Sequence, residues 1–187
     1  MIKLTEETVK KYWAYMTKKF KIRVKKKTGS WLMALIQPFT GISKKDWPRF
    51  STMLGRTLYT DIVPGEQESS LLSQIILITH ECQHRAQQYR RAFSFSLQYL
   101  FSPRFRMRIE CGAYESEMEI YFKILGEAPP YSTFMDKLKF YLLRQKDLEK
   151  AAIILSNSRA SVVQGFVTTS AGRHGLYWFA LKGQVND

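Results

Sequence analysis

The stretch of sequence that decides the fold is "ILITHECQHRAQQY", residues 76–89. His80 and His84 fall four positions apart, and Glu81 directly follows the first histidine. From Leu71 to this stretch, apolar residues return every three or four positions, a spacing that predicts an amphipathic helix with one buried stripe. Both histidines are therefore expected on one face of a helix, about one turn apart.

Two imidazoles placed in this way can reach one cation at the roughly 2.0–2.1 Å that is typical of zinc. Glu81 is rotated about 100° around the helix from His80, so its carboxylate is expected beside the ion rather than on it. Zinc lowers the pKa of a water molecule to about 7 and polarises a carbonyl, and a carboxylate beside it can accept the proton as the water attacks. The spacing predicts amide hydrolysis with Glu81 as general base. The alternative is a pair of ordinary histidines on a helix surface.

A second predicted helix carries the third ligand that a catalytic zinc needs. Ser102 suits its N-cap, Pro103 its first position and Gly126 its end. Glu110 lies inside this helix and is predicted to bind zinc. Ala113, one turn further, is small enough to let the two helices approach each other closely.

Glu117 lies about 10 Å beyond Glu110 on the same face, so it is expected to orient a histidine rather than to bind zinc. The alternative for Glu110 is a solvated carboxylate that pairs with Arg106 or Arg108. Candidates for the donor that stabilises the oxyanion forming on the substrate are Tyr114, His174 and Tyr177. His174 is expected in a glycine-flanked loop, which either folds over the cleft or simply leaves the histidine exposed. For Tyr114 the alternative is a residue that packs in the core.

Three further residues near the motifs have simpler interpretations. Gln87, one turn after His84, either forms a hydrogen bond near the site or is exposed. The two cysteines of the chain, Cys82 and Cys111, are too few for a disulfide scaffold and do not have the paired spacing of a structural zinc site. Both are expected to be small buried side chains.

The motif "HECQH" followed by "ECGA" resembles the gluzincin group of zinc metallopeptidases, in which a His-Glu-x-x-His helix precedes a helix that donates a glutamate. The wider pattern, roughly residues 45–125, is similar to small metallopeptidase-like domains of bacteria and phages. This resemblance implies a minimal gluzincin-like domain in which the His-Glu-x-x-His helix packs on the glutamate-bearing helix. It also implies that the strand at 56–63, "RTLYTDIV", is the edge strand that pairs with an extended peptide or protein substrate.

The chain has 187 residues, of which 45% are hydrophobic, and these values predict one domain with a sizeable core. We expect a predominantly helical α+β fold with a small sheet. Within the single domain 1–187, residues 1–30 form a basic amphipathic helical segment, 45–125 the zinc-peptidase-like core and 132–187 a C-terminal helix and tail. The helix is expected over 132–156, and a weak strand or hairpin near 177–181.

The formal net charge is +13, which favours polyanionic neighbours. The segment "KKFKIRVKKK", residues 18–27, is either a contact for nucleic acid or an acidic partner or a solvated face. Its basic residues are Lys18, Lys19, Lys21, Arg23, Lys25, Lys26 and Lys27. No nucleic-acid-binding motif is present, so sequence-specific DNA recognition is not expected. If the arginines around the motif helices flank the cleft, acidic peptides should be preferred.

No signal peptide and no run of 18 apolar residues is found, so a cytoplasmic protein is expected, or a virion protein if a phage encodes it. The alternative function is a non-catalytic structural or assembly protein, for example a phage virion component, that keeps the metal to stabilise its fold and binds nucleic acid or an acidic partner through its basic surface. A structural site would be closed by a fourth protein ligand, whereas a catalytic one is open. A third possibility is a protease associated with nucleic acid, whose activity would rise with added DNA.

Overall fold

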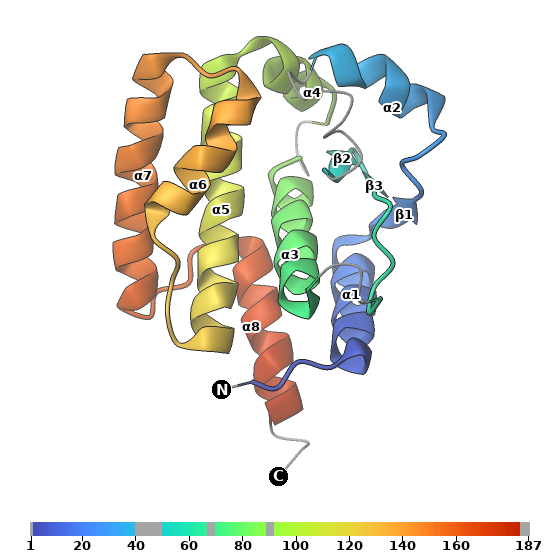
Figure 1. Ribbon diagram of the computed structural model, residues 1–187, viewed down its shortest axis with the longest axis vertical. Helices are drawn as coiled ribbons and strands as arrows, with labels where there is room; N and C mark the ends of the chain where they lie inside the picture. Colours follow the sequence, from blue (N-terminus) through green and yellow to red (C-terminus); the bar gives the residue numbers. More distant parts are fainter. Residues whose placement is uncertain (1, 40–49, 67–69, 89–91, 184–187) are drawn as a thin grey trace.

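The computed structural model describes residues 2–39, 50–66, 70–88 and 92–183, which form eight α-helices and a small three-stranded sheet (Figure 1). In chain order the elements are α1 (Glu6–Phe20), β1 (Arg23–Lys25), α2 (Trp31–Ile36), η1 (Gln37–Phe39), β2 (Thr52–Leu54), β3 (Thr57–Tyr59), α3 (Leu71–Gln88), α4 (Ala92–Phe101), α5 (Pro103–Leu125), α6 (Tyr131–Leu138), η3 (Lys139–Tyr141), α7 (Gln145–Val163) and α8 (Ser170–Gly183). The predicted class, predominantly helical α+β, is confirmed.

Local capping contacts fix the start of α1 and both ends of α5, and the two ends of α5 agree with the prediction. The hydroxyl of Thr5 accepts a hydrogen bond from the Thr8 amide at 3.1 Å and caps α1. Ser102 caps α5 by accepting from the amide of Phe105 at 3.3 Å. Gly126 ends α5 with a φ of 79°, a conformation that costs glycine little.

The sheet has the order β1-β3-β2, with β3 parallel to β1 and antiparallel to β2. The strand predicted over 56–63 is shorter, Thr57–Tyr59, and it is the central strand rather than an edge strand. The edge prediction is wrong because the basic segment after α1 supplies Arg23–Lys25 as a further strand, all three residues of which are exposed. The edge that faces the candidate site belongs to β2.

After α6 and η3, the chain forms two more helices, at 145–163 and 170–183. The structure differs from the prediction for this part of the chain in two places. The helix expected over 132–156 is two helices, because Leu142 adopts a left-handed conformation with a φ of 52° between η3 and α7. The strand or hairpin expected near 177–181 is instead part of α8.

The glycines of α8 explain the second error. A Cβ at Gly175 would lie 2.5 Å from the hydroxyl oxygen of Tyr12 and 2.6 Å from Cδ1 of Ile120. Gly175 therefore serves close packing between helices, and it does not mark a turn.

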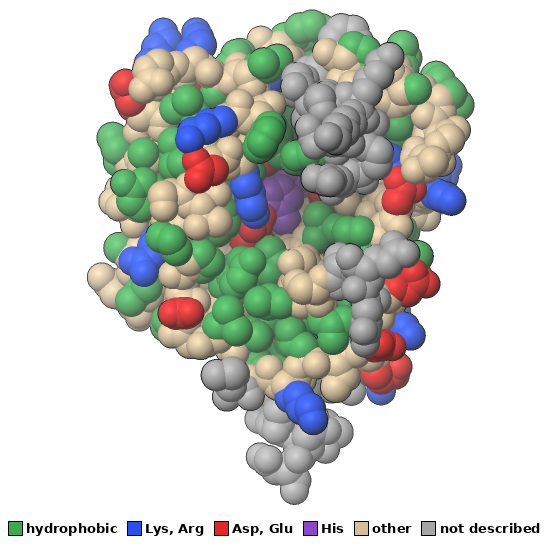
Figure 2. Space-filling model, viewed as in Figure 1, with side chains coloured by type: hydrophobic (Ala, Val, Ile, Leu, Met, Phe, Trp, Pro, Cys, Tyr) green, Lys and Arg blue, Asp and Glu red, His purple; other side chains and the backbone are tan. Residues whose placement is uncertain are grey.

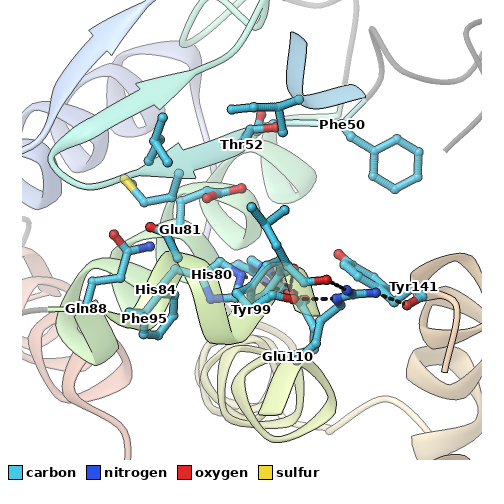
Figure 3. A pocket seen from close by; sticks show the side chains of 17 residues that line it. Phe50, Thr52, His80, Glu81, His84, Gln88, Phe95, Tyr99, Glu110 and Tyr141 are labelled. Carbon is cyan, nitrogen blue, oxygen red and sulfur yellow. Dashed lines mark hydrogen bonds and ion pairs between the residues drawn. The ribbon is translucent and has the colours of Figure 1, made fainter. Parts of the chain in front are cut away.

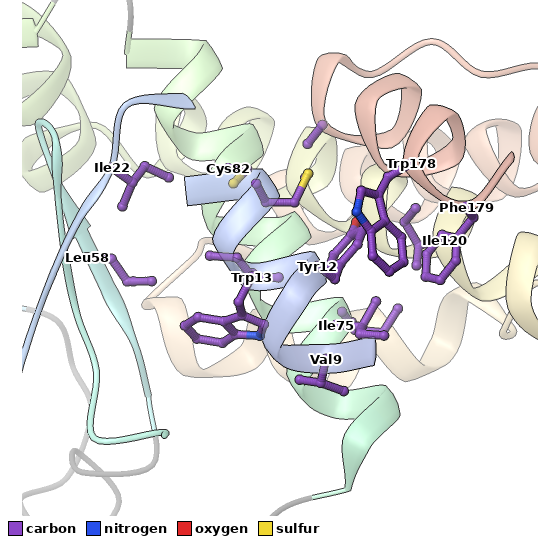
Figure 4. Close-up of a cluster of buried hydrophobic side chains, with 14 of the residues drawn as sticks. Val9, Tyr12, Trp13, Ile22, Leu58, Ile75, Cys82, Ile120, Trp178 and Phe179 are labelled. Atoms are coloured by element: carbon purple, nitrogen blue, oxygen red, sulfur yellow. The ribbon is translucent and has the colours of Figure 1, made fainter. Parts of the chain in front are cut away.

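Two hydrophobic clusters build the core, and α5 contributes to both. The first joins α1, α3, α8 and the sheet, with the ring of Tyr12 5.1 Å from that of Trp178 and 5.2 Å from that of Phe179 (Figure 4). The second joins α5, α6 and α7 around Phe134 and Leu155. The candidate site lies where α3 meets α5, between the two clusters.

Candidate metal centre

Helix α3 is held firmly against α1, which fixes the histidine motif. The hydroxyls of Tyr12 and Thr79 lie 2.8 Å apart, and the indole N–H of Trp13 donates to the carbonyl of Gln74 at 3.0 Å. Ile75, one turn before Thr79, is fully buried. One face of α3 therefore packs into the core, while the opposite face presents the histidines to α5.

Helices α3 and α5 approach each other closely beside the motif. A Cβ at Gly112 would lie 2.7 Å from the side-chain nitrogen of Gln87, so a larger residue at this position would displace the Gln87 amide. The next residue, Ala113, is fully buried, in agreement with the small side chain expected there. This spacing lets a short carboxylate on α5 reach the imidazoles on α3.

The structure brings together His80, His84 and Glu110, whose potential ligand atoms all lie within 4.8 Å of one another. Nε2 of His80 is 3.6 Å from one carboxylate oxygen of Glu110, and Nε2 of His84 is 3.5 Å from the other. The two imidazole rings are perpendicular, with centroids 4.5 Å apart. Among the described residues this metal-ligating group has three members, and all three are buried.

The outer nitrogen of His80 is held by a carboxylate. Nδ1 of His80 lies 2.7 Å from Oε1 of Glu117, while Oε2 of Glu117 accepts from Nζ of Lys137 at 2.9 Å. An ionised carboxylate accepts hydrogen bonds and does not donate them, so Nδ1 carries the proton and Nε2 faces Glu110. This is the contact expected of Glu117.

His84 is oriented by Gln87, the residue for which two interpretations were open. The side-chain nitrogen of Gln87 donates to the carbonyl of Ile109 on α5 at 3.0 Å. The amide oxygen of Gln87 is therefore the atom that faces Nδ1 of His84, at 3.1 Å. Both histidines thus direct Nε2 toward Glu110.

The electrostatics of the cluster follow from burial and from its two carboxylates. Burial alone would lower the pKa of His80, but Glu110 and Glu117 outweigh burial and hold that pKa well above its usual range. Burial alone would raise the pKa of Glu110, but His84 and His80 hold it low, so this carboxylate stays ionised. Burial lowers the pKa of His84. Without a metal, His80 therefore carries a second proton and is positively charged.

Glu81 is buried beside the cluster, and its Oε2 has no hydrogen-bond partner among the residues that the structure describes. Burial raises its pKa to about 7, with Glu110 adding to the effect and His80 and Lys27 opposing it. Lys27 is itself buried, and its Nζ donates to the carbonyl of Phe50 at 2.5 Å. A carboxylate with a pKa near neutrality is suited to accept and release a proton.

A cavity opens beside these residues, between α3, α4, α5 and the edge of β2. Figure 2 shows a histidine at the bottom of a hollow, and Figure 3 shows Glu81 between the histidine pair and Thr52 of β2. Most of the other side chains around it are apolar or aromatic: Ile36, Phe50, Met53, Leu54, Phe95, Tyr99, Leu100 and Tyr141.

Arg106 lines this cavity, and its guanidinium is bound to backbone carbonyls around it. Its guanidinium donates to the backbone carbonyls of Tyr99, Leu100 and Tyr141 at 2.6–2.9 Å. Glu110 is fully buried, so the alternative of a solvated ion pair with Arg106 or Arg108 is wrong.

Two of the three predicted oxyanion donors lie away from the site. His174 and Tyr177 are on α8, where the ring of His174 packs 5.5 Å from that of Phe20, and Tyr177 is exposed. The loop expected around His174 is a helix, so this residue does not fold over the cleft. Tyr114 is buried with its ring 5.3 Å from that of His80, and it packs on Phe134.

The basic segment 18–27 lies at the end of α1 and in β1, and most of its lysines are exposed. Lys27 is the exception, because it is buried next to the site. Both cysteines are free and buried, as predicted. Two of the arginines around the motif helices, Arg90 and Arg91, lie outside the described residues.

Sequence reasoning missed Tyr99, Tyr141, Lys137 and the burial of Lys27. The hydroxyl of Tyr99 donates to Oε1 of Glu110. Tyr141 interacts through its hydroxyl with Tyr114 and Glu110, and burial holds the pKa of Tyr141 well above its usual range, so the hydroxyl stays protonated. None of these residues belongs to the histidine motif or to a sequence pattern around it, so no local signal marks them.

Comparisons with known proteins identify no relative: no family model, no curated protein and no solved structure matches this chain. No helix among the described residues has both the length and the apolar character needed to cross a bilayer.

Proposed function

We propose that this chain is a zinc-dependent metallopeptidase of gluzincin type, with the metal held by His80, His84 and Glu110. The observation that carries the proposal is the position of a candidate three-residue ligand group at the wall of a cavity. Beside it lies a buried carboxylate, Glu81, one oxygen of which has no hydrogen-bond partner in the described parts of the chain. A fourth protein ligand, which the structural alternative requires, is not part of the group among the described residues.

The donor set fits zinc. Two imidazole nitrogens and one carboxylate are ligands that zinc accepts, and a tetrahedral site with bonds of roughly 2.0–2.1 Å places its ligand atoms about 3.3 Å apart. The two nitrogen–oxygen distances to Glu110, 3.6 Å from His80 to Oε2 and 3.5 Å from His84 to Oε1, are close to this value, and each runs to a different oxygen of the carboxylate. Oε2 of Glu110 is buried and makes no hydrogen bond within the described structure, and Nε2 of His80 lies 3.6 Å from it. A metal ion between these two atoms would satisfy both.

The residues of the chain divide the chemistry between them. When bound, zinc would polarise the substrate carbonyl and make a water molecule more acidic. Glu81 accepts the proton of the attacking water and passes it to the leaving amine, a task for which its raised pKa is suited. Glu117 and Gln87 keep the imidazoles aligned.

Tyr141 is our candidate for the group that stabilises the oxyanion on the substrate. It lines the cavity beside Glu110 and keeps its proton. A neutral hydroxyl that points to the developing charge is a suitable donor. Tyr141 replaces His174 and Tyr177 in this role.

The lining of the cavity favours peptides with an apolar side chain next to the cleaved bond. Phe50, Met53 and Phe95 contribute apolar surface, and the guanidinium of Arg106 is occupied by three carbonyls. The preference for acidic peptides expected from the arginines is therefore replaced by a preference for apolar ones. The edge of β2 that no described strand pairs with is the segment that would pair with an extended substrate.

The test combines metal content with peptide cleavage. Wild type purified without a metal-affinity tag should contain about one zinc per chain and cleave fluorogenic peptides that carry Leu or Phe at the central bond. Glu81→Gln should keep the zinc and lose at least about 100-fold in kcat/KM. Glu115→Gln is the matched control, because Glu115 bonds Thr168 away from the site.

Two results would contradict the proposal separately. If wild type takes up no zinc even after reconstitution, the metal centre is wrong. If Glu81→Gln binds zinc and cleaves as fast as wild type, the assignment of the general base is wrong.

A further inference from the structure

Exposed apolar side chains gather on three elements that surround the cavity. Ile36 of α2 and Leu100 of α4 line the cavity together with Phe50, whose ring lies 6.1 Å from that of Phe140 in η3. Figure 1 shows α2 and α4 at one end of the molecule. The large apolar residues exposed on these elements and just after η3, called here the apolar rim, are Trp31, Leu35, Leu97, Phe101, Phe140 and Leu142.

Helix α2 shows the most unusual surface of the rim. Trp31, Ala34, Leu35 and Pro38 follow the spacing of one helix face, and all four are exposed. Trp31 is 77% exposed and Leu35 60%. The solvent face of a helix on a globular protein is normally polar, so an apolar one indicates a surface that is covered in use.

Positive charge flanks the rim. Residues 18–60 contain 11 basic residues and one acidic residue, and residues 83–109 contain six arginines and no acidic residue. The rest of the chain has 12 basic and 15 acidic residues, so the excess of positive charge is concentrated in these two segments. Exposed basic residues directly before α2 and in the first turns of α5 are Arg23, Lys25, Lys26, Arg104 and Arg108.

We propose that the apolar rim docks the protein on an anionic lipid bilayer. Trp31 and Leu35 insert at the boundary between headgroups and acyl chains, the depth that interfacial helices reach and that tryptophan prefers. The flanking lysines and arginines contact the anionic headgroups, which are complementary to them in charge. An apolar rim next to a surplus of lysines and arginines matches this occupant better than a protein surface with balanced charges, although Asp61 and Asp136 also lie near the rim.

The docked orientation has a consequence for the cavity. Because α2, α4 and η3 all border it, the cavity lies next to the bilayer surface, where it meets polypeptide segments that leave the membrane. This step rests on the proposed peptidase function, whereas the docking does not, and vesicle binding tests the docking without any turnover.

The experiment is co-sedimentation with sucrose-loaded vesicles, either of phosphatidylcholine alone or with about a third phosphatidylglycerol. Wild type should sediment with the anionic vesicles, and the bound fraction should fall with added salt. The double variant Trp31→Ser, Leu35→Ser should weaken the partition coefficient at least about tenfold. The double variant Ile153→Ser, Phe166→Ser removes two equally exposed apolar residues outside the rim and should bind as wild type does.

Circular dichroism and thermal unfolding of each variant would establish that it is folded. The proposal is wrong if the rim variant binds as tightly as wild type, if the control variant loses as much, or if neutral vesicles bind equally well. It is also wrong if the rim variant converts a dimer into a monomer in light scattering and wild type ignores vesicles, because the rim is then an interface between two copies. Glu81→Gln should bind vesicles as wild type does, which separates failure of docking from failure of catalysis.

Discussion

Nδ1 of His80 lies 2.7 Å from Oε1 of Glu117, across 37 positions of sequence, and the second oxygen of Glu117 accepts from Lys137. Three helices, α3, α5 and α6, therefore fix the orientation of one imidazole. The carboxylate keeps the proton of His80 on Nδ1 and leaves Nε2 as the ligand atom.

Replacement of this carboxylate should weaken metal binding without removing it. Glu117→Gln keeps the shape of the side chain but loses the charge that fixes the tautomer of His80, so we expect zinc affinity to fall about 10- to 100-fold. Competition with a chromophoric chelator measures the change. Glu115→Gln, on the same helix, should leave the affinity unchanged, and an equal loss in both variants would contradict the role of Glu117.

Zinc binding should release a proton. In the metal-free chain the carboxylates of Glu110 and Glu117 overcome burial and raise the pKa of His80, so this residue is charged at neutral pH and must lose its proton to bind zinc. Affinity should therefore rise with pH, by about tenfold per unit over the range below that raised pKa.

Isothermal titration calorimetry at pH 7, in two buffers that differ in ionisation enthalpy, counts the released protons. We expect about one for each zinc ion bound. Zinc binding to Glu117→Gln should release fewer protons than zinc binding to wild type, because the neutral amide no longer stabilises the charged form of His80. A count near zero for wild type would show that His80 is neutral before the metal binds.

Substitutions of Tyr141 and Tyr99 should distinguish an effect mainly on catalysis from an effect mainly on metal binding. Tyr141→Phe removes the proposed oxyanion donor, so kcat should fall about 100-fold while KM stays close to that of wild type. Because Tyr141 also interacts with Glu110, zinc affinity should fall as well, but much less than kcat. Tyr99→Phe removes a donor to Glu110 and should act on zinc affinity instead. Tyr131→Phe, a substitution at an exposed position of α6, is the control. Unchanged kcat in Tyr141→Phe would exclude this donor.

Gly175 offers a test of the packing of α8. In an exposed helix, Gly→Ala stabilises by about 1 kcal/mol through propensity alone. At position 175 the added methyl group meets Tyr12 and Ile120 at 2.5 and 2.6 Å, so Gly175→Ala should instead lower the free energy of unfolding, by about 1–3 kcal/mol. Urea denaturation of wild type and variant measures the sign of this change in the free energy of unfolding. Stabilisation would mean that α8 can shift to make room.

The helices that carry the candidate site could be predicted because their signals are local. The cap at Ser102, the end at Gly126 and the apolar stripe before His80 each depend on a few neighbouring residues. Once two helices with inward faces are assumed, Glu110 and Glu117 follow from helical geometry. The three members of the candidate ligand group could therefore be named from the sequence, and the structure brings them together.

What could not be predicted depends on contacts between distant segments. The order of the strands depends on where Arg23–Lys25 returns after α1, and such a short, exposed and basic strand carries no alternating pattern. Tyr99 and Tyr141 reach Glu110 because of how α4 and η3 pack on α5. Gly175 looks like a turn residue in the sequence, because its contact partner Tyr12 is more than a hundred positions away.

Helix α5 belongs to both hydrophobic clusters, since Ile120 and Ile124 face the first and Met107 and Met118 face the second. The separation between Glu110 and the imidazoles is consequently set by two cores at once. A substitution in either cluster that moves α5 would therefore also move Glu110 relative to His80 and His84. The geometry of three buried polar side chains thus depends on the packing of apolar residues that touch none of them.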